Sequence, residues 1–282
     1  MTAVAETDAA RFARALHPID VRDLGVQYSL RFTRKTTFRT SFAKLVRPPA
    51  QREFWALRNV SFQVSHGEAL GVIGPNGAGK STLLQAIAGI IQPSEGVVDV
   101  VGHISAMLHL QAGFDQDLSG RDNIMLAGAF MGVDHRTMVE RQESIIDFAD
   151  IGLYIDEPLK KYSMGMRARL GFAIATAVDP DILLLDEVVS TGDEVFRAKS
   201  KVRVHEIVSA AKAVVLVTHD MNWILEFCTR AILLEHGNIV AQGEPEQIVE
   251  LHIARSEQRQ REKEAETARI MATAPPKLPR TA

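Results

Sequence analysis

Cysteine is almost missing from this sequence of 282 residues, in which Cys228 is the single example. One cysteine can form no internal disulfide and no zinc site built from cysteines alone. A reducing, intracellular setting is therefore the simplest one. We expect Cys228 to behave as a small, buried apolar residue.

A strong charge of one sign and a long apolar run are also missing. The formal net charge is -3, so no broad basic field indicates a nucleic-acid partner. No apolar run approaches the ~18 residues that a membrane-spanning helix needs. Residues 1–6 lack the basic and apolar regions of a signal peptide. If the protein acts at a membrane, we expect another chain to cross it.

A glycine-rich loop is the feature around which the sequence is organised. It matches the pattern G-x-x-x-x-G-K-[ST] with Gly74, Pro75, Asn76, Gly77, Ala78, Gly79, Lys80 and Ser81. Apolar residues 69–73 before it predict a buried strand, and the run that begins at Thr82 has apolar residues at helical spacing. This context favours a phosphate-binding loop over a chance glycine-rich turn.

Such a loop binds phosphate because glycines let the backbone turn tightly and present consecutive N–H groups to an anion. The start of the following helix adds the positive end of its dipole. Lys80 can reach the outer phosphates, and the Ser81 hydroxyl can ligate Mg²⁺. The sequence therefore predicts a site for a nucleoside triphosphate and Mg²⁺ that extends from Gly74 to Thr82.

The remaining pattern alternates strands with helices. Strand-like segments are expected at 18–28, 54–73 with a turn at 65–68, 96–107, 182–185 and 213–217, and as a hairpin of 231–235 and 238–241. The stretch from about 119 to 178 has a helical pattern. This alternation predicts an α/β fold with a mostly parallel sheet.

Two carboxylates follow the apolar strand 182–185. Asp186, at the end of this strand, can hold Mg²⁺ through water, and Glu187 can orient or deprotonate an attacking water. The alternative is an ordinary acidic turn. The phosphate loop upstream favours a role in the nucleotide site over this alternative.

A second anion site is expected where Ser163 and Gly165 begin an amphipathic helix. Here the chain resembles the ATP-binding-cassette (ABC) ATPases, whose signature L-S-G-G-Q occupies this place. The serine and second glycine are kept, but Met164 and Met166 depart from the pattern. His219 matches the family's switch histidine, and residues 190–193 match the loop that carries an aspartate across the dimer. The resemblance covers residues 18–250.

The resemblance implies a fold, a domain organisation and an assembly. It implies a cassette at 18–253 with a RecA-like core, an antiparallel β portion and a helical portion near 115–178, between a flexible arm (1–17) and a charged, partly disordered tail (254–282). Two copies would face each other head to tail. ATP held at Lys80 of one copy would be closed by Ser163 and Gly165 of the other, and His219 would contact the γ-phosphate.

Two further positions carry family roles. The family stacks adenine on an aromatic residue after the first strand, where Tyr28 lies, with Phe54 and Trp55 as alternatives and a core role open for each. The glutamine that senses Mg²⁺ and the membrane partner is best matched by Gln111, one place off the usual spacing, although a surface glutamine without a role is the alternative.

The departures from the general pattern are similar to the cassettes of polysaccharide exporters, as are residues 54–62 and 113–124. These serve O-antigen, capsule, teichoic acid or galactan export. The resemblance implies ATP hydrolysis at the cytoplasmic face of the cell membrane, a separate permease in two copies, a lipid-linked polysaccharide as cargo and no nucleic acid. The alternatives are another cargo (a drug, lipid or nutrient) and a soluble ABC ATPase without a transporter.

Two charged segments remain. In 29–53, cationic residues outnumber the single acidic residue, and Phe38, Phe42 and Leu45 share one helical face. This pattern predicts a basic amphipathic helix. Such a helix could contact a membrane surface or a lipid-linked sugar. Packing of its apolar face on the cassette is the alternative. The charges of 256–268 are predicted to form a solvated face.

Overall fold

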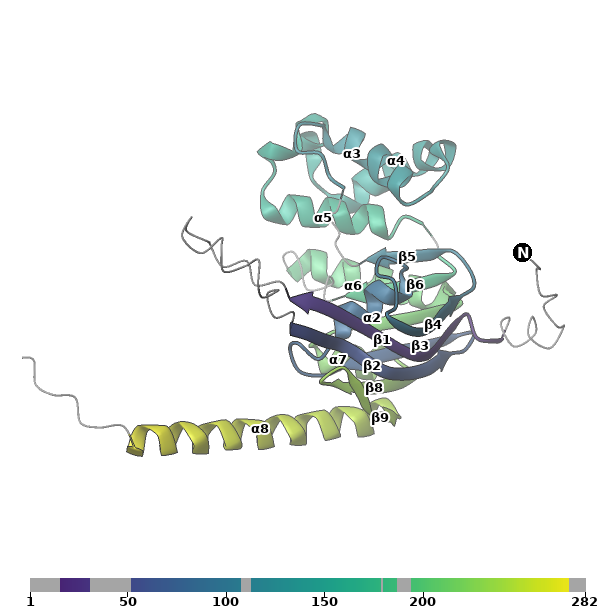
Figure 1. Ribbon diagram of the computed structural model, residues 1–282. Coiled ribbons are helices and arrows are strands. Elements are labelled where there is room, and N and C mark those ends of the chain that lie inside the picture. The colour runs from purple at the N-terminus through teal and green to yellow at the C-terminus, as the bar shows by residue number, and fades with distance from the viewer. Residues whose placement is uncertain (1–15, 31–51, 108–112, 179, 187–193, 274–282) are drawn as a thin grey trace, which may run out of the picture.

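The computed structural model describes residues 16–30, 52–107, 113–178, 180–186 and 194–273 (Figure 1). Gln111, Glu187, the loop 190–193 and residues 31–51 of the basic segment lie outside the described residues. Within the described ranges, no helix combines the length and the apolar character that crossing a membrane requires.

A six-stranded sheet with the strand order β5-β6-β7-β3-β8-β9 forms the centre of the molecule. Its strands are β3 (Glu68–Ile73), β5 (Ile104–Met107), β6 (Ile182–Asp186), β7 (Ala213–Val217), β8 (Arg230–Glu235) and β9 (Asn238–Gly243). Neighbouring strands are parallel except β8 and β9, which form an antiparallel hairpin. The predicted mostly parallel sheet and the predicted hairpin are confirmed.

The central strands are apolar on both faces because both faces are covered. In β3, Leu70 and Val72 belong to one cluster of buried side chains, while Ala69 and Ile73 belong to another. Successive side chains of a strand point to opposite faces, so these two clusters lie on the two sides of the sheet. This explains why the strand that leads into the phosphate loop shows no polar alternation.

A smaller antiparallel sheet covers the first face. Its order is β2-β1-β4, with β1 (Ile19–Leu30), β2 (Arg52–Val64) and β4 (Glu95–Val100). Helix α2 (Lys80–Ile87) shares a core with both sheets, since its Leu83 and Leu84 are fully buried in the same cluster as Leu57 and Val215. The predicted antiparallel portion near the N-terminus is confirmed.

Three helices cover the other face of the central sheet. They are α6 (Glu194–Ala210), α7 (Met221–Phe227) and α8 (Pro245–Thr273), and they contribute Phe196, Val204, Ile224 and Ile248 to the second cluster. Helix α8 continues far beyond the sheet (Figure 1). The boundary expected after residue 253 falls inside this continuous helix.

The helical portion forms a body of its own beside the sheets. It contains α3 (Gly120–Phe130), α4 (His135–Ala149), the 3-10 helices η3 (Gly152–Asp156) and η4 (Leu159–Lys161), and α5 (Met164–Ala175). A separate core holds these elements together and includes Ile124, Met138, Ile145 and Leu170. Helix α5 lies on the side of this body that faces α6 (Figure 1). The predicted helical portion is confirmed.

Candidate functional site

Three strands bring the phosphate loop, Asp186 and the turn with His219 to one edge of the central sheet. Strands β3, β7 and β6 are neighbours, and Val217 of β7 is paired in register with both Val72 and Asp186. The phosphate loop after β3, the Asp186 carboxylate and the turn after β7 therefore lie at the same carboxyl edge. Ligands of open α/β sheets bind at this edge.

The backbone of the phosphate loop requires glycine at both of its ends. Gly74 and Gly79 have φ angles of 153° and 106°. A Cβ atom would lie 2.0 Å from the Leu234 carbonyl oxygen at Gly74, and 2.5 Å from the Ala56 carbonyl oxygen at Gly79. Gly79 is the N-cap residue of α2 and, being glycine, has no side chain with which to cap the helix. The loop thus leaves its helix N-terminus to an anion.

The Lys80 side chain reaches from the start of α2 back to the beginning of the phosphate loop. It is only 7% exposed, and its ammonium donates hydrogen bonds to the carbonyl oxygens of Gly74 (2.8 Å) and Pro75 (3.1 Å). These two bonds hold the ammonium charge beside the first two residues of the loop. Ser81 follows at an exposed position in the first turn of α2, and Thr82 is half-buried.

His219 lies in a braced turn between β7 and α7. The Asp220 N–H donates to the Thr218 hydroxyl (3.0 Å), and the Asp220 carboxylate accepts from the Asn222 N–H (2.9 Å) as the cap of α7. His219 is exposed between these two bonds. A tight turn with an exposed imidazole suits contact with a ligand phosphate at the sheet edge.

Ser163 begins α5, as the sequence predicts. Its hydroxyl accepts a hydrogen bond from the Met166 N–H (3.2 Å), which makes it the helix cap. Gly165 adds no bulk, and a Cβ there would meet nothing closer than the Ser163 hydroxyl at 3.9 Å. The preceding Tyr162 is buried, donates its hydroxyl to the Tyr154 carbonyl (2.6 Å), and has its pKa raised to about 12 by that burial. This anchor holds the helix start in place.

The three aromatic candidates for adenine differ in their surroundings. Tyr28 is paired with Phe54 across β1 and β2, and the two are 38% and 53% exposed. Trp55 instead packs against Gly25, and the Arg58 guanidinium lies 5.2 Å from the centre of its ring. Side chains opposite each other in an antiparallel pair share one face of the sheet. Tyr28 and Phe54 therefore remain the two available surfaces, while Trp55 is engaged in packing.

An ion-pair cluster that the sequence did not predict lies beside the phosphate loop. The buried Glu235 carboxylate, at the end of β8, accepts hydrogen bonds from Arg255 and Arg259 of α8. The solvated face predicted for 256–268 is therefore wrong for Arg259, because its guanidinium has a buried partner. Two features of the sequence are consistent with this cluster. An acidic residue directly follows the apolar run 231–234, and two arginines lie one helical turn apart.

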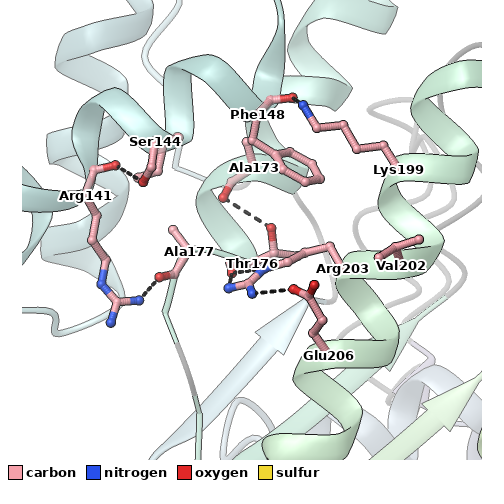
Figure 2. A pocket seen from close by; sticks show the side chains of 11 residues that line it. Arg141, Ser144, Phe148, Ala173, Thr176, Ala177, Lys199, Val202, Arg203 and Glu206 are labelled. Atoms are coloured by element: carbon pink, nitrogen blue, oxygen red, sulfur yellow. Dashed lines mark hydrogen bonds and ion pairs between the residues drawn. The ribbon is translucent and has the colours of Figure 1, made fainter.

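A hollow of about 750 Å³ lies between the helical portion and α6 (Figure 2). Its cations are bound to carbonyl groups: Arg203 donates to the Thr176 oxygen, Arg141 to Ala177 and Lys199 to Phe148. Thr176 and Ala177 lead towards the amino end of β6, whereas the phosphate loop follows the carboxyl end of β3. This hollow is thus separate from the candidate nucleotide site. Its cationic side chains bind backbone carbonyl groups and so stabilise the fold.

Comparison with known proteins identifies relatives of the chain. Residues 57–190 match the family model described as ABC transporter. The chain is 42% identical over 196 residues to the ABC transporter protein AbcA of Aeromonas salmonicida, covering 70% of this chain and 64% of that protein. It is 43% identical over 199 residues to the teichoic acids export ATP-binding protein TagH of Lactococcus lactis (71% and 42%).

A third relative is matched over most of its length. The O-antigen export system ATP-binding protein RfbB of Klebsiella pneumoniae is 40% identical over 201 residues, covering 71% of this chain and 82% of that protein. The chain thus spans under two thirds of AbcA and TagH but most of this RfbB.

Solved structures share the fold. A dimer of the ATP-binding cassette MJ0796, in a post-hydrolysis state bound to ADP and Pi, matches with a TM-score of 0.64 at 21% identity. The match covers 80% of this chain and 98% of that chain. At this identity the likeness supports the fold.

Proposed function

Since this chain belongs to the ABC transporter family, we propose that it binds and hydrolyses ATP to drive export through a separate membrane protein. The observation that carries this proposal is the convergence at one sheet edge of the phosphate loop, Asp186 and the His219 turn. These are the parts that phosphoryl-transfer enzymes of the phosphate-loop class use to position a nucleotide and a metal.

Each predicted site residue has a role in this proposal. Lys80 and the loop N–H groups bind the phosphates, and His219 contacts the γ-phosphate. Glu187 orients the attacking water and takes its proton. Tyr28 stacks on adenine.

Mg²⁺ fits the oxygen donors present. Ser81 and Asp186 supply a hydroxyl and a carboxylate, and Gln111 is proposed to add an amide oxygen. Mg²⁺ prefers such ligands and usually keeps several waters, so few protein ligands suffice. When bound, the ion neutralises the charge that develops on the phosphates.

The proposed cargo is a lipid-linked polysaccharide. The relatives TagH and RfbB are named for the export of teichoic acids and O-antigen, and they share about 40% identity with this chain. We propose two cassettes and two permease copies, with the cassettes at the cytoplasmic face of the membrane. The basic segment 29–53 is proposed to help substrate engagement, apart from ATP chemistry.

ATP hydrolysis by the assembled transporter tests the chemistry. Glu187→Gln is expected to keep ATP binding, because the phosphate loop is unchanged, and to lower turnover by ~10²-fold or more, the range for a lost general base or water-positioning group. Lys80→Ala is the matched control and is expected to lose ATP binding itself. Wild-type turnover by Glu187→Gln would contradict the assignment of this residue.

Cells that lack the gene test the cargo. We expect lipid-linked polymer to accumulate inside them, and we expect the wild-type gene, but not the Glu187→Gln variant, to restore its export. Normal polymer export in cells without the gene would contradict the proposed cargo and favour another one, while leaving ATP hydrolysis in place.

A further inference from the structure

The carboxylate of Glu235 is the centre of a buried ionic cluster at the end of β8. Its side chain is 6% exposed. Arg255 donates from Nε to both carboxylate oxygens (3.2 Å each) and from Nη2 to one (3.0 Å), and Arg259 donates from Nη1 (2.5 Å). Burial alone raises the pKa of Glu235, but the hydrogen bonds from both arginines outweigh it and lower that pKa below its usual value. The carboxylate is therefore held charged.

The residues on both sides of Glu235 support the phosphate loop. The carbonyl oxygen of Leu234, just before it, lies against Gly74 so closely that no Cβ would fit. Just after it, the N–H of Gly237 donates to the Ala78 carbonyl (3.0 Å), and the Gly237 carbonyl accepts from the N–H of Arg58 (2.9 Å). The end of β8 thus contacts the phosphate loop at its first glycine, and the turn between β8 and β9 contacts the loop again near its end.

Helix α8 binds the end of β8 through its arginines. Its first part is packed in the core through Ile248 and Val249, and it carries both arginines that bind Glu235. His252 of the same helix is half-buried, and this burial is the main cause that lowers its pKa.

We propose that Glu235 is a positioning residue for the nucleotide site. Fixed by two arginines of α8, it holds the end of β8 and the turn that follows in the place where Leu234 and Gly237 support the phosphate loop. Without its charge, two guanidinium groups lose a shared partner, and a half-buried cation without a partner draws water or moves. The turn then shifts, and with it the loop that binds ATP. This inference rests on the proposed function.

The experiment measures binding of a non-hydrolysable ATP analogue, adenylyl imidodiphosphate with Mg²⁺, to the full chain by calorimetry. Glu235→Gln is expected to weaken binding about tenfold, the loss typical of a hydrogen bond to a charged group. In the assembled transporter, KM for ATP should rise while kcat stays near the wild-type value, because support of the loop acts on bound ATP and on the transition state alike.

Glu68→Gln is the matched control. Glu68 is also a poorly exposed acid paired with an arginine, at 2.6 Å from Arg230, but it lies at the amino end of β3, opposite the phosphate loop. We expect this variant to lower the melting temperature and to bind the analogue like the wild type. Arg259→Gln, paired with Arg259→Lys, is the second test: the glutamine should weaken binding and the lysine, which keeps the charge, should restore part of it.

Three outcomes would overturn the inference. Wild-type affinity in both Glu235→Gln and Arg259→Gln would do so alone. Equal losses of affinity in Glu235→Gln and Glu68→Gln would reduce the effect to general stability. If the wild-type chain itself fails to bind the analogue, the proposed function fails first and the inference fails with it.

Discussion

Single glycines set the geometry of the phosphate loop at the residue scale. Gly74 and Gly77 both have a positive φ, but their surroundings differ. A Cβ at Gly74 would collide with the backbone of Leu234, whereas a Cβ at Gly77 would meet no atom of the described residues within 4 Å. The pattern G-x-x-x-x-G-K-[ST] marks Gly74 as required, and the structure gives the reason: a neighbouring strand occupies the space of its side chain.

This difference predicts unequal effects of the same substitution. Gly74→Ala is expected to abolish ATP binding, because backbone atoms of β8 and the loop have to separate. Gly77→Ala is expected to weaken binding only mildly, since it adds a left-handed backbone cost of ~1 kcal/mol without a clash. Titration of each purified chain with ATP measures both. Equal affinities of the two variants would show that the clash at Leu234 does not control the loop.

At the element scale, hydrogen bonds from α6 join the helical portion to the core of the sheets. Arg203 of α6 donates from Nε (3.2 Å) and Nη2 (2.7 Å) to the carbonyl of Thr176, just after α5, and Lys199 donates to the carbonyl of Phe148 near the end of α4 (3.2 Å) (Figure 2). Carbonyls at helix ends lack partners within their own helix and attract cations. These bonds therefore satisfy the ends of two helices while joining two parts of the fold.

The cost of losing one such bond is predicted from its geometry. Arg203→Gln is expected to lower the free energy of unfolding by ~1–3 kcal/mol, because the buried end of α5 loses a charged donor. Lys201→Gln on the same helix is the control: it removes an exposed ion pair with Glu226, worth under ~1 kcal/mol. Urea denaturation of the full chain measures both. If the two variants are equally stable, the bond to Thr176 contributes nothing beyond a surface pair.

At the scale of the whole molecule, the two predicted halves of the nucleotide site belong to different bodies. Lys80 begins α2 within the core of the sheets, whereas Ser163 caps α5 in the helical portion, which has a core of its own. The family resemblance assigns Ser163 to the nucleotide of a second copy, and a relative in fold, MJ0796, has been solved as a dimer. A shared site of this kind can be tested by mixing two defective chains.

Mixing Ser163→Arg with Lys80→Ala is expected to restore partial ATP hydrolysis, while each variant alone is nearly inactive. A mixed dimer has one site with both faults and one site with neither. Asp134→Ala controls for the lost helix cap, since Asp134 caps α4 in the same way and its loss also costs ~1 kcal/mol. Activity of the mixture no higher than that of the two variants measured separately would argue against a site shared between copies.

The sequence by itself determined the features that depend on near neighbours in the chain. The sequence predicted the phosphate loop between a strand and a helix, the buried strands 182–185 and 213–217 and the helix start at Ser163, because backbone geometry and hydrophobic period act over a few residues. The mostly parallel direction of the strands in the central sheet also followed from the alternation of strands and helices.

Only the tertiary structure decided the contacts between residues far apart in the sequence. It separates Trp55, packed against Gly25, from Tyr28 and Phe54, although all three are aromatic residues near strand ends. It also brings Glu235 to Arg255 and to Arg259, and the second of these arginines lies in the segment 256–268 that the sequence predicted to be a solvated face. Composition and period cannot identify such partners, because the path of α8 depends on how the whole core packs.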